Sequence, residues 1–504
     1  MTLSIVLGRA LDGLNAPAVR VETNLANGLP GISIVGLPET AVKESRDRVR
    51  AAITNSGFEF PDRRITINLA PADLPKDGGR FDLPIALGIL AASGQIASDY
   101  LTDHEFVGEL SLAGELRPIT GALPAALAAG KAGHGLILPL ENVEEAALVT
   151  SLDIRAARHL LDVTQHLNGG NNLARHKSRP MATMPDYGVD MSDVRGQPQA
   201  RRALEIAAAG RHHMLMVGPP GTGKTMLATR LATIMPPMTD AEALESAAIL
   251  SIGRGGFDSS KYRQRPVRTP HHTSSGVALV GGGSNPRPGE ISLATHGILF
   301  LDEFTEFEKR VLEVLREPLE TGHITISRAA RQADFPANFQ LIAAMNPCPQ
   351  GYDCDLRNNC QCTPEQQRRH RSRISAPILD RIDLQIEVPK LPKEALRERS
   401  AETEDSATIR ARVTHARQQQ IARCGKANAT MTNREVETWC TLDDSCQTLL
   451  DTAMDRFNLS ARAYHRILKV ARTIADLGNC EEISTLHLTE ALGYRAMDRW
   501  MTGK

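Results

Sequence analysis

The sequence predicts a mixed α/β protein that contains several domains. Short strand patterns alternate with helical ones over residues 1 to about 165, and a second alternation runs from about Asp193 to Val388. Between them, residues 168–185 are polar, non-periodic and rich in glycine, asparagine and proline, as linkers are. Helical patterns dominate the remainder. These observations predict an α/β domain over 1–167, a linker over 168–190, an α/β core over 191–390 and a helical domain over 391–504.

Length and composition are those of a globular protein with two to four cores. The chain has 504 residues, of which 41% are hydrophobic and 23% charged. A formal net charge of −1 gives no overall attraction to polyanions, so nucleic-acid binding must come from local basic features. The N-terminus lacks the basic flank of a signal peptide, and no apolar run approaches the roughly 20 residues of a membrane span. We therefore expect a cytoplasmic protein without membrane contact.

The first domain is expected to contain four early strands and three helices. The strands have β-type patterns and the helices a 3.6-residue periodicity. The strands are predicted over residues 4–10, 18–22, 31–37 and 64–70, and the helices over 39–56, 82–94 and 121–133.

A phosphate-binding loop follows the first strand of the second alternation. Its sequence, GPPGTGKT, matches G-x-x-x-x-G-K-[ST] and lies between an apolar strand and a helix. Glycines let backbone N–H groups wrap around phosphates, and the helix directs its positive N-terminus at them. We expect Lys224 to contact the β- and γ-phosphates of ATP and Thr225 to bind Mg²⁺. The whole loop consists of Gly218, Pro219, Pro220, Gly221, Thr222, Gly223, Lys224 and Thr225.

An apolar strand that ends in two carboxylates follows about 75 residues later. Residues 297–303 read GILFLDE. We expect this strand to be the direct neighbour of the phosphate-loop strand in the sheet. Asp302 would then hold the Mg²⁺ shell and Glu303 would polarise the attacking water.

Two further segments carry polar groups suited to the γ-phosphate. Residues 339–346, FQLIAAMN, end in Asn346, whose amide can orient water at a strand end. Arg381, in the segment LDRID, is placed to neutralise transition-state charge as an arginine finger does. A salt bridge to Asp380 or Asp383 is the alternative role for Arg381.

Four of the eight cysteines crowd into fifteen residues. They are Cys348, Cys354, Cys360 and Cys362. Four thiolates suit tetrahedral Zn²⁺, although the C-x5-C-x5-C-x-C spacing differs from paired C-x2-C knuckles. A structural zinc and four thiols without metal are both open interpretations. A basic run follows, consisting of Arg368, Arg369, Arg371 and Arg373, and it is either a solvated surface or part of a binding interface.

Several segments together resemble the ComM/YifB family of magnesium-chelatase-like AAA+ proteins. They are GQPQARRALEIAAAG before the phosphate loop, TPHHTSS at 269–275, GILFLDE, AAMNP and SAPILDRIDL. The resemblance covers nearly the whole chain. It implies an ATPase that uses ATP and Mg²⁺, assembles into a homo-hexamer and places Arg381 against the neighbouring subunit. It also implies that Arg462 is the sensor 2 arginine of a helical lid, with Arg466 as the alternative.

The resemblance assigns two insertions to the AAA+ core. Residues 276–289 look like a loop inserted in helix 2, and residues 322–336 look like a β-hairpin before the sensor 1 strand that carries Asn346. Related helicases direct such hairpins into the ring channel, where Arg328 and Arg331 would meet DNA phosphates. A solvated hairpin tip is the alternative.

The N-terminal domain is similar to the proteolytic domain of Lon, an S5-type α/β fold. Residues 71–79, PADLPKDGG, and 116–142 carry the similarity. Lon uses a serine nucleophile and a lysine base. Here the expected serine falls on Arg80, and the expected lysine falls on Leu123 or Ala125. We therefore predict a Lon-like fold without peptidase chemistry.

The family implies a hexameric DNA translocase or helicase that drives branch migration and integration of incoming DNA during natural transformation. Its partners would be single-stranded and branched DNA. A magnesium-chelatase-type remodelling motor is the alternative, although the chain carries a Lon-like domain and no integrin-type metal-binding domain. An ATP-dependent protease is a further alternative, against which the missing serine and lysine argue.

Overall fold

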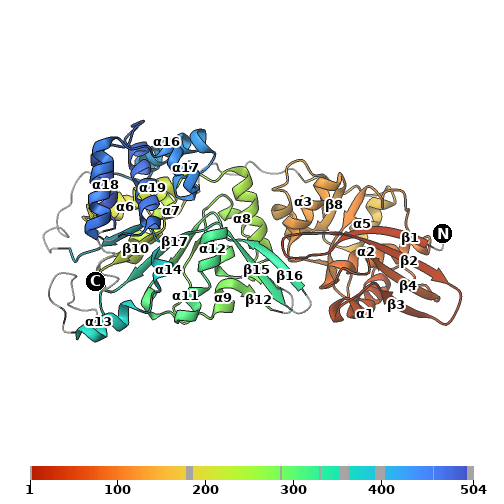
Figure 1. Ribbon diagram of the computed structural model, residues 1–504. Coiled ribbons are helices and arrows are strands. Elements are labelled where there is room, and N and C mark those ends of the chain that lie inside the picture. Colours follow the sequence, from red (N-terminus) through yellow and green to blue (C-terminus); the bar gives the residue numbers. More distant parts are fainter. Residues whose placement is uncertain are drawn as a thin grey trace. The chain divides into compact units, whose positions relative to one another are not determined.

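The computed structural model describes residues 3–176, 185–283, 286–328, 331–350, 360, 362–391, 403–457 and 459–495. Two units form the molecule (Figure 1). The N-terminal unit comprises Met1–Ala182 and Leu244–Tyr262, and the P-loop unit comprises Thr183–Ala243 and Arg263–Lys504. Within the described ranges, the longest and most apolar helices still fall short of what a membrane crossing needs.

A seven-stranded mixed sheet forms the centre of the N-terminal unit, in the order β3-β4-β2-β1-β5-β8-β9. The strand β2 is antiparallel to β1 and β4, whereas the other neighbours are parallel. Every second residue of β2 is buried, as in a strand with one face on the core. The strands are β1 Leu3–Arg9, β2 Ala18–Ala26, β3 Gly31–Val35, β4 Arg64–Ala70, β5 His104–Phe106, β8 Gly135–Pro139 and β9 Ile154–Ala157, with a short ribbon of β6 Glu109–Leu110 and β7 Leu116–Arg117.

The described part of residues 1–182 also contains five helices. The helix α2 is buried along its whole length and packs on β1, β2 and α1, so it is the core of this unit. The four predicted strands and three predicted helices all form, and the helix ends lie within two residues of the predicted ones. The helices are α1 Thr40–Asn55, α2 Asp82–Ala92, α3 Ala122–Ala132, α4 Val143–Ala146 and α5 Leu160–Leu167.

The chain visits the N-terminal unit a second time. Most of α8, Asp240–Ile252, packs there, where Ala247 and Ala248 contact Leu123 in a small hydrophobic cluster. The Gly121 N–H donates to the Ser251 carbonyl oxygen at 3.2 Å. The predicted division into consecutive segments does not include this return of the chain.

A five-stranded parallel sheet forms the centre of the P-loop unit, in the order β11-β14-β17-β10-β18. The expectation that the strand ending at Asp302 directly neighbours the phosphate-loop strand is wrong, because β17 lies between β14 and β10. All three strands are parallel, so their carboxyl ends still meet at one edge. The strands are β10 Met214–Val217, β11 Val267–Arg268, β14 Ile298–Leu301, β17 Gln340–Met345 and β18 Leu384–Glu387.

Two small antiparallel ribbons extend from this sheet. The strands β12 Gly281–Gly282 and β13 Arg287–Pro288 pair within the first predicted insertion. The strands β15 His323–Arg328 and β16 Arg331–Pro336 form a hairpin in which Arg328 is paired with Arg331. Helices of four to six residues surround the ribbons: α9 Gly276–Val280, α10 Glu290–Leu293, α11 Lys309–Glu313 and α12 Arg316–Thr321.

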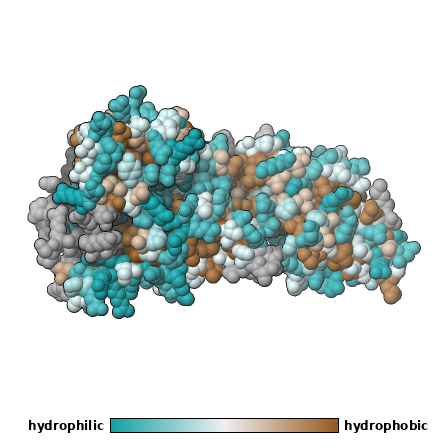
Figure 2. All heavy atoms as spheres, in the orientation of Figure 1, coloured by the Kyte–Doolittle hydropathy of each residue, from teal (hydrophilic) through white to brown (hydrophobic). Residues whose placement is uncertain are grey.

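The remaining described helices of the P-loop unit are mostly longer. The helices α6, α7, α16 and α19 pack on one another, and one continuous hydrophobic core joins them to the sheet. The visible face over α16–α18 is mostly hydrophilic, whereas more hydrophobic residues show on the N-terminal unit (Figure 2). The helices are α6 Pro198–Gly210, α7 Lys224–Ile234, α13 Pro364–Arg371, α14 Ala376–Leu379, α16 Ser406–Cys424, α17 Asn433–Trp439, α18 Asp444–Phe457, α19 Ala461–Leu477 and α20 Thr485–Gly493.

Candidate nucleotide-binding site

The phosphate loop connects β10 to α7 at the carboxyl edge of the sheet. A Cβ atom at Gly218 would lie 2.2 Å from the Val388 carbonyl oxygen, so only glycine fits there. Gly223 has a φ of +88°, which side chains rarely adopt. The helix α7 begins at Lys224, immediately after this turn. The local geometry therefore presents a helix N-terminus and a curved backbone, which together suit a phosphate.

Lys224 lies within the loop and not in open solvent. Its Nζ donates to the carbonyl oxygens of Gly218 at 2.7 Å and Pro219 at 2.8 Å, and to Asn346 Oδ1 at 3.3 Å. Burial lowers the pKa of Lys224, and the charge of Asp302 partly offsets this effect. A phosphate would be a stronger acceptor than these carbonyl groups, so the ammonium group is placed to transfer its bonds to a nucleotide.

Thr225 and Asp302 meet across the sheet edge. The Thr225 hydroxyl donates to Asp302 Oδ2 at 2.7 Å. A hydroxyl and a carboxylate are hard oxygen ligands of the kind Mg²⁺ takes in addition to substrate phosphates and water. The two residues therefore fit a magnesium ion, which would neutralise phosphate charge when bound.

One cavity of about 680 Å³ brings these groups together. Its size is in the range of small-molecule sites. The phosphate loop forms one wall, and Asp302, Glu303 and Asn346 lie on the strand ends opposite. Residues 269–272 complete the lining. The predicted loop, carboxylates and amide thus share one cavity.

The Glu303 carboxylate is turned toward a histidine. His272 Nδ1 lies 2.9 Å from Glu303 Oε2, and both residues line the cavity. The Glu303 backbone has a φ of +51°, in the left-handed region that non-glycine residues seldom adopt. This histidine belongs to the TPHHTSS segment, for which the sequence predicted no role in the site. The sequence feature that could have pointed to it is a pair of adjacent histidines just after a strand of a parallel sheet.

Arg381 lines a different cavity, of about 540 Å³, together with the helix α12 and the start of β15. Its guanidinium forms an ion pair with Glu320 and donates to the Pro377 carbonyl oxygen at 2.7 Å. Arg381 thus forms a salt bridge, but with Glu320 and not with Asp380 or Asp383, the two partners that the sequence suggested. The side chain is 12% exposed and Glu320 is 67% exposed, so the pair lies at the rim of the unit.

The two lid arginines differ sharply in environment. Arg462 is 69% exposed and lies 3.9 Å from Asp380 Oδ2. Arg466 pairs with the buried Asp383 and donates to the Arg381 carbonyl oxygen at 3.0 Å. Burial alone would raise the pKa of Asp383, but the Arg466 and His212 partners hold it far below its usual range. Arg466 therefore ties α19 to the segment that carries Arg381.

Three of the four clustered cysteines lie close together. The Sγ atoms of Cys348, Cys360 and Cys362 are all within 4.8 Å of one another, whereas Cys354 lies outside the described residues. Thiolates on a tetrahedral zinc ion lie about 3.8 Å apart, so this group fits a zinc site. The helix α13 follows at once, and its His370 Nε2 lies 3.0 Å from the Asn346 carbonyl oxygen.

The predicted DNA residues are at the far end of the hairpin. The backbones of Arg328 and Arg331 face each other across the last pair of β15 and β16, and their side chains lie outside the described part of the structure. In the basic run, Arg368 and Arg369 are exposed, whereas Arg373 pairs with Glu306 at 2.9 Å.

Family models of the magnesium chelatase subunit ChlI match most of the chain. The model for magnesium chelatase, subunit ChlI, matches residues 190–396, and two further ChlI models match 21–142 and 403–495. The competence protein ComM of Haemophilus influenzae is 51% identical over 503 residues, 99% of this chain and 98% of its own. YifB of Salmonella typhimurium is 50% identical over 499 residues, with the same coverage.

The chain belongs to the ComM/YifB family of magnesium-chelatase-like proteins. The family match and the parallel P-loop sheet agree with the predicted AAA+ core, and the family implies the use of ATP and Mg²⁺. A weaker similarity links the chain to the Lon protease of Mycolicibacterium smegmatis, which is 28% identical over 172 residues, 32% of this chain and 22% of its own.

Proposed function

We propose that this ComM/YifB-family chain is a cytoplasmic ATP-hydrolysing motor that acts as a homo-hexamer on branched and single-stranded DNA. In this proposal it promotes branch migration as incoming DNA is integrated during natural transformation. One observation carries the proposal: Lys224, Thr225, Asp302 and Asn346 meet in one cavity, in a chain 51% identical over nearly its full length to a competence protein.

Each residue of the cavity has a chemical role in this proposal. Lys224 and the loop N–H groups hold the phosphates, and Thr225 with Asp302 would hold Mg²⁺. Glu303 polarises the attacking water, and Asn346 orients it against the γ-phosphate. Replacing Glu303 by glutamine keeps the shape but removes the base. We expect Glu303→Gln to bind ATP normally and to lose turnover by about 10² to 10⁴. Nucleotide binding by fluorescence and phosphate release by a coupled assay measure the two steps separately.

Arg381 is proposed to act in trans, on the nucleotide of the neighbouring subunit. It lines a cavity other than the nucleotide cavity of its own chain, and its present partner Glu320 is well exposed. A neighbouring subunit could therefore displace Glu320 without disturbing the core. We propose Arg462, which is exposed at the first turn of α19, as the lid arginine that contacts the bound nucleotide.

The hairpin is proposed to grip DNA in the ring channel. Its last strand ends four residues before β17, which carries Asn346 at its end, so a change at the γ-phosphate has a short path to the hairpin. The nearest acid after the arginines, Asp334, already accepts a hydrogen bond from Thr325 Oγ1 at 2.7 Å. Repetition of Arg328 and Arg331 around a hexamer would supply a basic ring in a protein with almost no net charge.

The test measures ATP turnover and strand separation with single-stranded and forked DNA. We expect DNA to stimulate the wild type. Arg328→Ala with Arg331→Ala should spare basal turnover, abolish the stimulation and flatten the salt dependence by about 0.7 log units per lost phosphate contact. Arg434→Ala with Arg456→Ala makes the same charge change at exposed positions of α17 and α18 and serves as the control. Unchanged unwinding in the hairpin variant would exclude the hairpin.

The chelatase-type remodelling motor is the second candidate, because the family models that match are those of a magnesium chelatase subunit. A remodelling motor of this class acts on a protein partner. The same assay separates the two functions, since turnover that ignores every DNA substrate would favour the remodelling motor.

We further infer that Cys348, Cys354, Cys360 and Cys362 hold a structural zinc ion. The thiols of Cys348, Cys360 and Cys362 lie close enough for shared coordination. Elemental analysis of the purified protein should find about one zinc per chain. A Cys360→Ser, Cys362→Ser variant should contain none, whereas Cys480→Ser, at an exposed position elsewhere, should keep the metal. A wild type without metal would contradict the inference.

A further inference from the structure

The guanidinium group of Arg381 is engaged within its own chain. It forms an ion pair with Glu320 and donates to the Pro377 carbonyl oxygen at 2.7 Å. A guanidinium group carries its donors in a rigid fork, and one that neutralises phosphate charge directs that fork at the phosphate. The donors that Arg381 gives to Glu320 are therefore not available to a nucleotide of the neighbouring subunit. The ion pair must break before Arg381 can act in trans.

The charges around Arg381 favour this resting position. The carboxylates of Glu313, Glu317 and Glu320 line its cavity of about 540 Å³, together with the cations of Arg316 and Arg381. Three negative and two positive groups leave the lining with a formal charge of −1. Such surroundings attract a guanidinium group and repel an approaching phosphate. Glu320 is 67% exposed, so water competes for its carboxylate and the pair can break without disturbing the core.

A single hydrogen-bonded turn connects Glu320 to the hairpin. Glu320 lies in the last turn of α12, and β15 begins at His323. Between them, the Gly322 N–H donates to the Pro318 carbonyl oxygen at 3.0 Å, and the Gly322 carbonyl oxygen accepts the Ala337 N–H at 2.7 Å. The turn is thus bonded both to α12 and to the residue that follows β16. A shift of the hairpin therefore reaches Glu320 directly through this turn.

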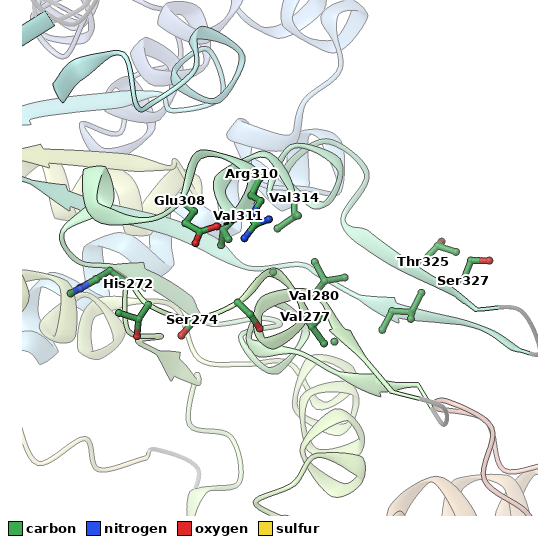
Figure 3. A pocket seen from close by; sticks show the side chains of 15 residues that line it. His272, Ser274, Val277, Val280, Glu308, Arg310, Val311, Val314, Thr325 and Ser327 are labelled. Carbon is green, nitrogen blue, oxygen red and sulfur yellow. Dashed lines mark hydrogen bonds and ion pairs between the residues drawn. The ribbon is translucent and has the colours of Figure 1, made fainter. Parts of the chain in front are cut away.

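Two cavities border β15 and give the hairpin room to shift. Ile324 and Thr325 line the cavity of Arg381. A second cavity, of about 640 Å³, adjoins it, and we call it the hairpin cleft because β15 forms part of its wall. Figure 3 shows Thr325 and Ser327 at one end of the hairpin cleft, and Val280 and Val314 nearer its middle. Val280, Val314 and Thr325 line both cavities, so movement of β15 changes the surroundings of Arg381 as well.

We propose that Glu320 is a positioning residue that withholds Arg381 from the neighbouring subunit until the hairpin of its own chain shifts. DNA held by the hairpin moves β15, the turn at Gly322 carries Glu320 with it, and Arg381 is released toward the nucleotide of the adjacent subunit. Contact with DNA in one subunit thereby permits hydrolysis in its neighbour. This inference rests on the proposed function, because it assumes that Arg381 acts in trans and that the hairpin meets DNA.

Removing the charge of Glu320 tests the positioning role. Glu320→Gln keeps the shape of the side chain but weakens its hold on Arg381, so basal kcat should rise about twofold to fivefold, the factor that one exposed ion pair can supply, while KM for ATP stays within about twofold. Glu317→Gln makes the same charge change in the same helix and cavity, and it should behave as the wild type because the ion pair of Arg381 is with Glu320. An unchanged or lower basal kcat in Glu320→Gln would overturn the proposal.

A mixing experiment shows in which subunit the released arginine acts. A chain that carries both Lys224→Ala and Glu320→Gln should not turn over ATP itself, so any rate that it adds comes from a wild-type neighbour. Mixed in excess with wild type, it should raise turnover per wild-type chain above that in mixtures with Lys224→Ala alone. Adding Arg381→Ala to the same inactive chain should remove the gain. A gain that persists without Arg381, or the absence of any gain, would overturn the proposal.

The link to the hairpin is tested by DNA stimulation. In Glu320→Gln the ratio of DNA-stimulated to basal turnover should fall toward one, because Arg381 is already released. Combining this change with Arg328→Ala and Arg331→Ala should keep the raised basal rate, since release no longer depends on the hairpin. Full DNA stimulation in Glu320→Gln, or loss of the raised basal rate in the combined variant, would overturn the link between the hairpin and Glu320.

Failure of the proposed function would give different results. Normal turnover in Arg381→Ala would refute the role of Arg381 in trans and the role of Glu320 with it. A wild type whose turnover ignores every DNA substrate would refute the DNA part, while the basal rates and the mixtures still test the ion pair. Impaired turnover in Arg381→Ala together with wild-type behaviour in Glu320→Gln would leave the proposed function standing and overturn only the role of Glu320.

Discussion

Each unit of the molecule has a lysine beside a glycine-rich turn, and the two lysines differ in what surrounds them. In the N-terminal unit, Lys76 is fully buried and its Nζ donates to the Pro71 carbonyl oxygen. In the P-loop unit, Lys224 also donates to backbone carbonyls, but it lines a cavity of about 680 Å³ with a hydroxyl, two carboxylates and an amide. Burial lowers the pKa of both lysines.

The positions where Lon-type catalytic groups would fall are filled with packed side chains. Arg80 is 5% exposed and donates to the Thr120 carbonyl oxygen, and burial lowers its pKa to about 10. Leu123 and Ala125 are completely buried. Leu123 packs against the α8 segment that the chain inserts into this unit. Lys224 thus meets a cavity, whereas Lys76 and the side chains at the Lon-type positions are packed in the interior.

The largest expected effect tests the two lysines directly. Lys224→Ala should abolish ATP binding and turnover, because no other described ammonium group contacts the loop carbonyls that Lys224 contacts. Lys76→Met, which removes the same charge from the N-terminal unit, should leave turnover within about twofold of the wild type. Nucleotide binding and steady-state turnover of both variants provide the measurement. Equal losses of ATP binding and turnover in the two variants would show that the two lysines do not differ in function.

Arg381 gives the next largest effect and tests whether the P-loop cavity is complete in one chain. Arg381→Ala should keep ATP affinity and lower turnover by about a thousandfold, as loss of an arginine finger does. Mixing it with Lys224→Ala should recover part of the activity, because some mixed interfaces combine an intact loop with an intact arginine. A fully active monomer, measured by light scattering and turnover at the same concentration, would refute the role in trans.

A smaller expected effect is the pH dependence of the free energy of unfolding, and it again differs between the two units. Burial lowers the pKa of His213 in the P-loop unit from 6.5 to about 4. The unfolded chain therefore binds this proton more tightly, so the contribution of His213 to the free energy of unfolding is fully present above pH 6.5 and is lost, by up to about 3 kcal/mol, as pH drops toward 4. His213 Nδ1 accepts the Leu341 N–H at 3.0 Å, and His213→Asn keeps an acceptor while removing the titration.

Denaturant unfolding between pH 4 and 7 measures this difference. We expect the His213→Asn protein to lose less stability on acidification than the wild type. His166→Asn in the N-terminal unit is the comparison, since burial also lowers the pKa of His166 but its ring is only partly covered. His166→Asn should reduce the pH dependence of the free energy of unfolding less than His213→Asn does. The same pH profile in wild type and His213→Asn would contradict the argument.

The last prediction is that the protein has no proteolytic activity. Purified protein with ATP should not cleave casein or an unfolded substrate, because the Lon-type serine and lysine positions hold Arg80, Leu123 and Ala125. Gel assays over several hours, with an active protease as the positive control, make the measurement. Cleavage that a substitution within residues 76–125 abolishes would refute the prediction and give the N-terminal unit an enzymatic role.

Local patterns made much of the P-loop unit predictable. The glycine spacing of residues 218–225 fixes a turn before a helix, and the apolar runs before Asp302 and Asn346 form buried strands. The alternation of Ile324 and Ile326 with polar residues agrees with the strand β15 that they form. In each case the information lies within about ten residues, since turn conformation and strand periodicity depend on neighbours in the sequence.

The sequence was therefore enough to predict the phosphate loop, the strands before Asp302 and Asn346 and the family to which the chain belongs. Four features became visible in three dimensions: β17 separates β14 from β10, Leu244–Tyr262 returns to the N-terminal unit, Arg381 pairs with Glu320, and His272 lies beside Glu303. These contacts join residues about 30 to 130 positions apart in the chain. They arise because strands and helices must bury their apolar faces together, and the order in which they pack sets which polar groups meet at their ends.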